Sequence, residues 1–415
     1  LQKAGIKGNL YDVIKSMYIK KGVDLCVKNK NFVSGMFKSN VGVRQGDPTS
    51  PILFKLFIND ISKYLGDMNL GDMNLDVPDL NDMKLNHLLY ADDMILLSLS
   101  KEKLQNMVNG VALFCRDNGI SVNTNKSKVL VFEKKVSSNG IDILYNGSKL
   151  ENVSQYKYLG LMFHKSGKFE IARKDLLERA MKGTYKLISY FKQLQPSVST
   201  CLHLFDKIIV PIIMYGAEVS GVRCNRYLSF YREMRMDIFE KCHIRFCRFV
   251  LGVNKRTSIV GIYGEIGRLP LFVNNIIHFV KYWYRLAKMD KSNMLLYNTY
   301  ISNIHDNTDW FKSVKRILSL LNMDTNNSMR KSIGLIVKLV FKCCKAEFEK
   351  GWFEELINDK KNKVGGNKLR SYRTYKSHFC QEDYLLNCKN EIDRKNISRL
   401  RLSSHRLNIE TGRYG

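Results

Sequence analysis

The stretch LLYADDMILLS, residues 88–98, places two adjacent carboxylates, Asp92 and Asp93, in the middle of an apolar run. An ionised carboxylate in an apolar setting is costly, and two neighbouring carboxylates also repel each other. Two interpretations of this stretch remain open. The pair is the solvated turn of a β-hairpin, since Asp favours tight turns, or it is held at a hairpin tip to bind divalent cations, which prefer oxygen ligands.

Composition indicates a multidomain protein with a polyanionic partner. The 415 residues are 45% hydrophobic, which is enough for two or three domains with sizeable cores. Residues 1–100 carry 12 Lys and Arg against 11 Asp and Glu, whereas residues 101–415 carry 55 against 28. A net charge of +28 that is placed so unevenly favours nucleic acid as the partner over a surface charge that serves solubility alone.

The cysteines and the hydropathy of the chain bear on its compartment. We find no CxxC motif, no regular cysteine spacing, no signal peptide and no apolar run of roughly 18 residues. We therefore expect free thiols in an intracellular, reducing compartment, no membrane and no disulfide-linked partner. His378, Cys380, Cys388 and His405 could ligate zinc in principle, but their spacing matches no compact zinc pattern. Because the first residue is not Met, we expect the chain to begin inside a longer protein.

Periodicity predicts an α+β first part followed by a helical part. Apolar positions predict a buried helix at 52–61 and a helix at 101–118 that Gly119 ends. The repeated GDMN within 65–75 is expected to be a loop, and short strands are expected within 141–163. Later helices are predicted, the first of them long and basic, at 169–194, 226–251, 272–289 and 310–357.

Four stretches occur in a defined order: VRQGDPTSPILFKLFIND (43–60), LLYADDMILLS (88–98), NTNKSKVLVF (123–132) and YKYLGLMF (156–163). Together they resemble the palm motifs of reverse transcriptases, most closely those of non-long-terminal-repeat retrotransposons of the long interspersed element type. The resemblance covers about the first 165 residues and extends more loosely into the helical part, at residues 208–218, 251–254 and 263–271.

The resemblance implies a division of the chain into three regions. The first, at 1–165, is a partial polymerase palm, which is an antiparallel sheet with helices. The second, at 166–290, is a thumb-like basic helical region. The third, at 291–415, is a polar, helical C-terminal extension.

The activity that the resemblance implies is RNA-directed DNA polymerisation. Its partners are an RNA template, a DNA primer or duplex, and dNTP, and its cofactors are two Mg²⁺ ions. Asp92 then ligates metal, Asp93 adds negative field beside it, and Lys126 assists the pyrophosphate leaving group. An ordinary exposed lysine is the alternative interpretation of Lys126. A tight turn is required at the carboxylates, because neighbouring residues in a regular strand point to opposite faces.

The resemblance also assigns residues to template, nucleotide and primer. It places Arg44, Gln45, Gly46 and Tyr90 against the template and the incoming nucleotide, where a glycine lets the backbone approach without a Cβ clash. The segment expected to grip the primer end is Tyr158, Leu159 and Gly160. For Tyr158, plain core packing is the alternative.

The predicted thumb helix is expected to follow the duplex backbone, which gives a salt-dependent affinity that is indifferent to sequence. The basic residues concerned are Lys168, Arg173, Lys174, Arg179, Lys182 and Lys186. The sequence departs from the family pattern at Asp47 and Thr49, where the family usually has a small or apolar residue and Leu. An extra carboxylate near an incoming triphosphate is unfavourable, so this departure predicts weaker catalysis.

One carboxylate of the family pattern is expected outside this chain. In the family a third essential carboxylate lies on a strand upstream of the opening helix, and neither Asp12 nor Asp24 occupies that position. Because a cooperative site loses orders of magnitude when one member is removed, we expect the chain alone to be nearly inactive. The resemblance implies nuclear action, although no clear localisation run is present.

Three alternatives stay open at this point. A non-catalytic, nucleic-acid-binding relic of such an element retains the basic helical part. Another palm polymerase, such as an RNA-dependent RNA polymerase, shares the palm, whereas nucleotide cyclases lack the QG and YLG segments. A basic helical scaffold with an accidental YADD requires four ordered motifs to arise by chance.

Overall fold

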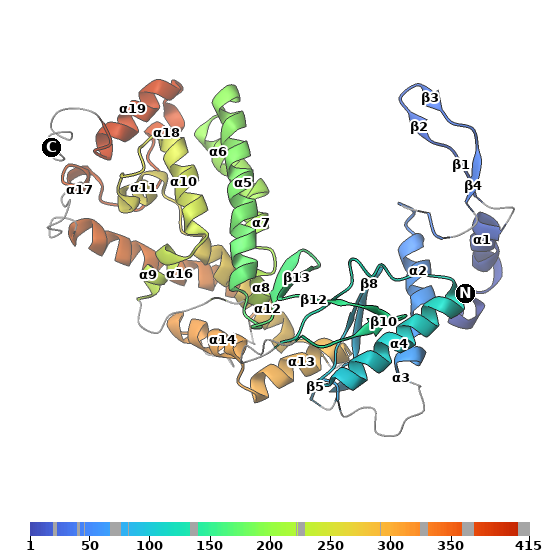
Figure 1. Cartoon of the computed structure of the whole chain (residues 1–415). Helices are drawn as coiled ribbons and strands as arrows, with labels where there is room; N and C mark the ends of the chain where they lie inside the picture. The colour runs from blue at the N-terminus through green and yellow to red at the C-terminus, as the bar shows by residue number, and fades with distance from the viewer. Residues whose placement is uncertain are drawn as a thin grey trace. The chain divides into compact units, whose positions relative to one another are not determined.

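The computed structural model describes residues 1–19, 23–39, 42–44, 46–66, 76–81, 83–132, 140–220, 222, 229–290, 292–323, 331–358 and 369–405 (Figure 1). Gln45 and most of the predicted GDMN loop lie outside these residues. The described residues fall into two units. The first comprises Leu1–Val131 and residues 140–153, and the second runs from Ser154 onward.

The first unit combines four helices with short strands that pair in twos. Its helical segments are η1 (Gln2–Ala4), α1 (Gly8–Ile19), α2 (Ser50–Ile58), α3 (Ile61–Gly66) and α4 (Lys101–Asn118). Its strands are β1 (Val23–Leu25), β2 (Lys28–Asn29), β3 (Phe32–Val33), β4 (Phe37–Ser39), β5 (Asp79–Leu80), β6 (Met83–Lys84), β7 (His87–Tyr90), β8 (Asp93–Leu96), β9 (Lys128–Val129), β10 (Leu144–Tyr145), β11 (Ser148–Lys149) and β12 (Glu151–Asn152).

The antiparallel sheet that the resemblance implies is present among the described residues only as separate two-stranded pairs. The pairs β1–β4, β2–β3, β5–β6, β7–β8 and β10–β11 are antiparallel, and β9–β12 is parallel. The fold is therefore mostly helical with small two-stranded sheets. Periodicity locates the strands, but pairing depends on contacts between residues far apart in sequence, which local patterns do not encode.

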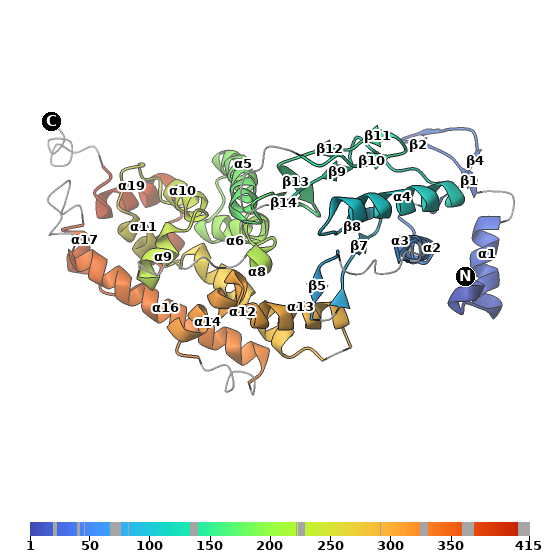
Figure 2. The same cartoon turned by 60° about the horizontal axis from the view of Figure 1, so that its bottom comes forward.

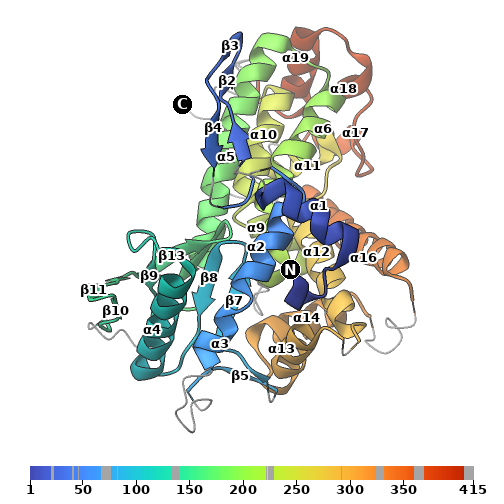
Figure 3. The same ribbon diagram turned by 90° about the vertical axis from the view of Figure 1, so that its right-hand side faces the viewer.

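Helix α4 forms the centre of the first core. Ser100 caps its start by accepting the N–H of Lys103, and Gly119 ends it at φ 65, as the sequence predicts. Gly110 brings α4 close to α3, since a Cβ there would lie 2.4 Å from the carbonyl oxygen of Tyr64. The fully buried ring of Phe114 packs edge-on against Tyr64. Figure 3 shows the β7–β8 hairpin next to this helix.

The second unit is helical apart from one hairpin. Its strands are β13 (Gln155–Tyr158) and β14 (Leu161–His164). Its helices are α5 (Glu170–Leu194), α6 (Val198–Ile208), α7 (Val210–Ile213), α8 (Ala217–Ser220), α9 (Phe230–Met236), α10 (Glu240–Leu251), α11 (Ile259–Ile266), α12 (Leu271–Ala287), α13 (Met294–His305), α14 (Asp309–Leu320), α16 (Ile333–Asn358), α17 (Tyr372–Tyr375), α18 (Tyr384–Asn387) and α19 (Glu391–Arg401).

The core of the second unit is built around α12. Ile276, Phe279 and Trp283 on this helix are at most 2% exposed, and α12 packs against α8, α14 and α16 (Figure 2). The long helix predicted at 169–194 is α5. Burying one apolar face along each helix accounts for the helical pattern in the sequence.

Two of the predicted helices are each interrupted in the structure. The helix predicted at 226–251 breaks at Asp237, whose backbone is extended and whose carboxylate accepts the N–H of Phe239 and pairs with Arg173. The helix predicted at 310–357 ends first at α14, where Asn322 adopts φ 50. A left-handed residue of this kind terminates a helix.

Among the described residues, no helix is both long and apolar enough to cross a membrane. The cysteines that the structure describes are free thiols. His378, Cys380, Cys388 and His405 do not assemble into a metal site, because no group of three or more described His, Cys, Asp or Glu side chains is placed to hold an ion.

Candidate active site

The YADD sequence forms a β-hairpin with a two-residue loop. Tyr90 pairs with Asp93 at the end of the β7–β8 ladder, so the loop is Ala91 and Asp92. Ala91 has φ 52, the positive value that both primed hairpin turns require at this position. This conformation costs an L-residue other than glycine roughly 1–2 kcal/mol. The hairpin predicted from residues 88–98 is confirmed, and its strained residue lies next to the carboxylates.

The hairpin separates an apolar face from a polar tip. Leu89 and Met94 face each other across the ladder and pack into the core of the first unit. Tyr90 and Asp93 form the next pair, so their side chains lie on the opposite face. Tyr90 is 63% exposed, and Asp92 and Asp93 are also exposed.

The two carboxylates of the turn remain open to ligands. Neither Asp92 nor Asp93 has a side-chain hydrogen bond or an ion pair with any described residue. Hard oxygen donors of this kind fit Mg²⁺, which is held by one or two carboxylates together with water and substrate phosphates. The donor set at this turn is therefore suited to a magnesium ion, and it comprises two carboxylates in the described part of the chain.

The turn before α2 presents a glycine in a conformation that other residues adopt only with strain. Gly46 has φ 86, and no atom lies within 4 Å of the position that a Cβ would take. The Arg44 guanidinium donates to the carbonyl oxygen of Met17 at 3.1 Å and lies over the ring of Tyr18. The backbone conformation therefore accounts for the glycine in this QG segment. Gln45 lies outside the described residues.

Asp47 and Thr49 have a local structural role. The Asp47 carboxylate accepts the Thr49 hydroxyl at 2.7 Å and the Thr49 backbone N–H at 2.8 Å. These two bonds, helped by the charge of Arg44, hold the pKa of Asp47 below its usual value. The carbonyl of Asp47 also accepts the N–H of Ser50, the first residue of α2. The DPTSP sequence is a helix-start signal that explains this carboxylate better than a catalytic departure does.

Lys126 lies exposed in the turn that precedes β9. Its backbone N–H donates to the carbonyl oxygen of Asn123 at 3.1 Å, and the Ser127 hydroxyl donates to the same oxygen at 3.0 Å. The turn is thus fixed by Asn123, and the lysine side chain is carried on its outer side.

The YLG segment forms a second hairpin turn, in the second unit. Tyr158 pairs with Leu161, and the two loop residues, Leu159 and Gly160, have φ 45 and φ 80. Two positive values define the type I′ pattern, in which leucine is rare. Tyr158 is half-buried, and its ring lies 6.4 Å from that of Phe163.

Two side chains hold the YLG turn: Tyr215, which the sequence did not identify, and Arg179, which was predicted to contact the duplex instead. The Tyr215 hydroxyl donates to the carbonyl oxygen of Leu159, and the Arg179 guanidinium donates to that of Gly160 at 3.0 Å. A Cβ on Gly160 would lie 3.4 Å from the Tyr215 ring. The MYG sequence at 214–216 was the available signal, because it lies in the loosely matching segment at 208–218.

Helix α5 carries a basic and aromatic face. Its exposed residues include Lys174, Lys182 and Lys186, and Lys168 is exposed just before the helix. Tyr185 and Tyr190 on the same helix are about half exposed. Helix α10 lies beside α5 (Figure 1), and the guanidinium of its Arg245 lies 4.6 Å from the centre of the Tyr185 ring.

Two of the basic residues predicted to follow the duplex are engaged within the protein. Arg173 is 7% exposed and pairs with Asp237, so its charge is neutralised inside the core. Arg179 bonds Gly160 and pairs with Asp175 at 2.9 Å. The sequence could not reveal this, because Asp237 lies 64 positions from its partner. Lys168, Lys174, Lys182 and Lys186 remain on the solvent side.

Comparison with known proteins assigns the first part of the chain. Residues 1–163 match the family model described as reverse transcriptase, an RNA-dependent DNA polymerase. They are a reverse transcriptase domain. Over 191 residues the chain is 24% identical to a Pol polyprotein from type-1 retrotransposable element R2 of Popillia japonica. Over 232 residues it is 21% identical to the RNA-directed DNA polymerase from mobile element jockey of Drosophila melanogaster.

These relatives place the reverse transcriptase domain in the non-long-terminal-repeat type, at distant identity. The match to the R2 protein covers 44% of this chain and 29% of that protein, and the match to the jockey protein covers 54% and 24%. The chain therefore spans less than a third of either relative. The reverse transcriptase match covers residues 1–163, and a helical region follows it.

Proposed function

We propose that this chain forms the polymerase site of a non-long-terminal-repeat retrotransposon and transfers a nucleotide from dNTP to a primer 3′-hydroxyl on an RNA template. The observation that carries this proposal is the turn at Ala91 and Asp92. Two exposed carboxylates without a described partner stand there beside a strained backbone, inside a reverse transcriptase domain. Strain and unpartnered charge at one turn are typical of functional sites.

Asp92 and Asp93 are the residues that would hold magnesium. When bound, Mg²⁺ ions activate the primer 3′-hydroxyl and stabilise the charge on the phosphoryl group in transfer. Asp92 at the loop supplies the ligand oxygens, and Asp93 adds negative charge beside it. The packed face of Leu89 and Met94 keeps the tip in place. Lys126 donates a proton to the pyrophosphate leaving group or stabilises its negative charge.

The template and primer contacts follow from the other turns. Arg44, Gln45 and Gly46, with Tyr90 at the hairpin tip, contact the template and the incoming nucleotide. The turn of Tyr158, Leu159 and Gly160 contacts the primer end. In support, Gly46 lies in a turn of positive φ with no atom within 4 Å of its Cβ position, so a substrate can approach the backbone there closely.

The basic face of α5 is proposed to follow the duplex backbone. The residues with this role are Lys168, Lys174, Lys182 and Lys186, whereas Arg173 and Arg179 position the protein itself. The regions of the chain are then a palm at 1–165, a thumb at 166–290 and a C-terminal extension at 291–415. We propose that the complete reaction takes place in the nucleus.

We further propose that the described carboxylates supply an incomplete metal shell. In the described part of the chain no group of three metal-ligating side chains is found, and the turn contributes two. A two-metal site that lacks one bridging carboxylate loses orders of magnitude in rate. The chain alone is therefore expected to extend primers poorly.

The test is primer extension on an RNA template with Mg²⁺ and dNTP. It compares the chain with a version that also carries the family's upstream strand and its carboxylate. We expect robust extension only in the longer version, and loss of that extension on Asp92→Ala. Robust extension by the chain alone contradicts the incomplete shell, and extension by Asp92→Ala in the longer version contradicts the site.

A second candidate function is a non-catalytic nucleic-acid-binding protein derived from such an element. The basic and aromatic face of α5 and α10 favours it, because this face does not depend on the carboxylates. RNA–DNA duplex affinity separates the two candidates. If the longer version binds duplex tightly and incorporates no nucleotide, the second function replaces the first.

A further inference from the structure

A pocket lies in the second unit where the α5–α6 joint meets the segment that leads into α19. Its volume is about 470 Å³, a size that accommodates a nucleotide-sized ligand. Pro196, Ser197 and Val198 form one side, and Lys389, Ile392 and Arg394 form the other. None of these residues belongs to the reverse transcriptase domain at 1–163.

Arg394 in this pocket is a buried cation with little internal compensation. The residue is 8% exposed, and no described carboxylate pairs with it. Its Nη1 donates to the carbonyl oxygen of Cys388 at a long 3.4 Å, and its Nε has no hydrogen-bond partner among the described residues. Burying a guanidinium is costly without an anion, so the site is incomplete without a negatively charged partner.

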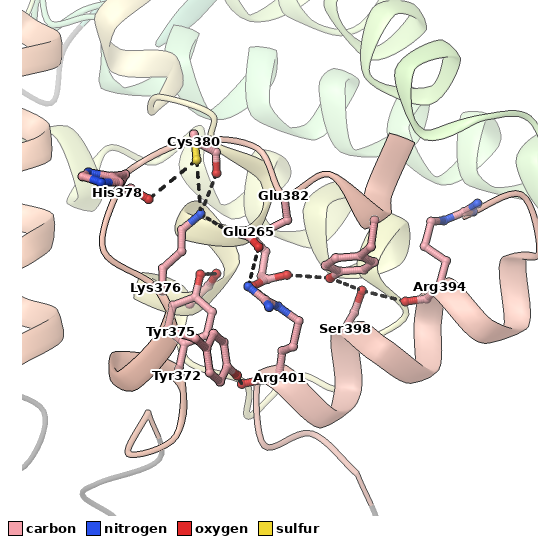
Figure 4. Close-up of polar contacts among 12 residues, drawn as sticks. Glu265, Tyr372, Tyr375, Lys376, His378, Cys380, Glu382, Arg394, Ser398 and Arg401 are labelled. Carbon is pink, nitrogen blue, oxygen red and sulfur yellow. Dashed lines mark hydrogen bonds and ion pairs between the residues drawn. The ribbon is translucent and has the colours of Figure 1, made fainter. Parts of the chain in front are cut away.

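The orientation of Arg394 separates it from the polar cluster at the other end of this segment. Figure 4 shows its guanidinium pointing away from the cluster around Glu265 and Arg401. Within that cluster Glu265 accepts from Arg401 at 2.8 Å and from Tyr384 at 2.5 Å. The cluster therefore fixes the wall that carries Arg394 and does not neutralise it.

The start of α6 adds positive potential to the same pocket. Helix α6 has no acidic residue in its first turn, so the partial positive charge of its N-terminus is uncompensated there. The Ser197 hydroxyl accepts the N–H of Thr200. The backbone N–H groups that precede Thr200 in the first turn point out of the N-terminal end of the helix. The acidic Glu391 on the opposite wall is paired with Lys395. Lys389 and Arg394 thus stand opposite a helix N-terminus, an arrangement suited to binding an anion.

We propose that this pocket binds a phosphate group of the nucleic-acid strand that follows α5. The inference rests on the proposed nucleic-acid function and adds a fixed contact to it. The pocket adjoins Gln195, the residue after the last residue of α5, so it continues the basic face of that helix. From Arg179 to Gln195 the helix rises about 24 Å. A strand that reaches from the YLG turn to the pocket therefore spans about seven nucleotides at 3.4 Å each.

The experiment measures binding of labelled RNA–DNA duplexes to the full chain as a function of salt. Lys389→Gln removes an exposed charge from the pocket, and Arg394→Gln removes the buried one. Lys338→Gln removes an exposed charge of the same kind from α16 and serves as the matched control. A second arm measures the shift in melting temperature that inorganic phosphate produces, which separates a free anion from a strand.

For duplexes well above seven base pairs, Lys389→Gln is expected to weaken binding roughly fivefold at physiological salt and to lower the salt slope by about 1. Lys338→Gln leaves both unchanged. For duplexes of four or five base pairs, the wild type, Lys389→Gln and Lys338→Gln are expected to bind with equal affinity. The phosphate shift is present in the wild type and lost in Arg394→Gln. If Arg394→Gln does not fold, Lys389→Gln carries the test.

The failure of this proposal is distinct from failure of the proposed function. If the pocket variants keep wild-type affinity and slope while Lys182→Gln and Lys186→Gln weaken binding, the pocket proposal is overturned and the function stands. If no variant alters duplex binding but phosphate still shifts the wild type and not Arg394→Gln, the pocket binds free phosphate and the strand proposal is overturned. If duplex does not bind at all, both are overturned.

Discussion

The two hairpin turns of this chain both have a positive φ at the first loop residue, and they differ in what surrounds the loop. Ala91 and Leu159 both adopt positive φ in two-residue loops where glycine or asparagine is usual. At the Leu159 turn, Tyr215 and Arg179 take up both loop carbonyls. At the Ala91 turn, the carboxylates have no described partner. One turn is fixed from within the protein, and the other is left open for a ligand.

The largest effect is expected where the turn is open. In a version that extends primers, Asp92→Ala should lower the rate at least about a thousandfold, because it removes a metal ligand from a cooperative site. RNA–DNA duplex affinity and unfolding free energy should stay near wild type, since Asp92 supports no described contact. Asp309→Ala, an exposed carboxylate of the second unit, is the control. Retained primer extension in Asp92→Ala would show that this turn has a structural role only and that Asp92 is not a metal ligand.

The fixed turn should respond in stability. Arg179→Met removes a charged donor and leaves the Gly160 carbonyl without it, which costs about 2 kcal/mol of unfolding free energy. Tyr215→Phe removes a neutral donor and should cost about 1 kcal/mol. Chemical denaturation of the second unit measures both. Equal unfolding midpoints for wild type and both variants would show that the turn does not depend on these bonds.

A loss of similar size is expected at the glycine of the same turn. Gly160→Ala forces an alanine into φ 80 and brings its Cβ to 3.4 Å from the Tyr215 ring, which should cost about 1–2 kcal/mol. Gly167→Ala is a useful comparison, because its φ is 67 and its Cβ would meet no atom within 4 Å. The difference in unfolding free energy between the two variants gives the cost of the contact with Tyr215, because the cost of the positive φ is common to both.

The smallest effect has the opposite sign. Ala91→Gly relieves the left-handed strain but raises the entropy of the unfolded chain, so it should stabilise the first unit by about 0.5 kcal/mol. Ala112→Gly in helix α4 should destabilise it by about 1 kcal/mol and serves as the control. Thermal melting of the two variants checks the sign. A loss of stability in Ala91→Gly would mean that the strain is relaxed elsewhere.

The two turns also differ in how much of their structure could be predicted from the sequence. An apolar run interrupted by two acidic residues was enough to predict the hairpin at 88–98, and Gly119 was enough to end α4. The strained Ala91 was not predictable, because alanine carries no left-handed preference. The same holds for Leu159. Local chemistry accounts for turns and caps, and strain at a particular residue depends on what the neighbouring structure imposes.

Contacts between distant segments account for the other misses. Arg173 looks like a surface cation by helical spacing, yet it is buried against Asp237. Short strands were predicted within 141–163 and are found there, but their pairing in twos was not predictable from the sequence. The weaker catalysis expected from Asp47 stays a prediction, and its hydrogen bonds to Thr49 fit the DPTSP helix-start pattern in the sequence.

The most direct test of the open turn is a titration of the chain with Mn²⁺, followed by electron paramagnetic resonance. Mn²⁺ substitutes for Mg²⁺ on oxygen ligands. We predict bound ion that is lost in the Asp92→Asn, Asp93→Asn double variant and kept in the Asp306→Asn, Asp309→Asn control, which removes the same charge from another exposed site. Equal binding by the wild type and the Asp92, Asp93 double variant would contradict the assignment of these two carboxylates as metal ligands.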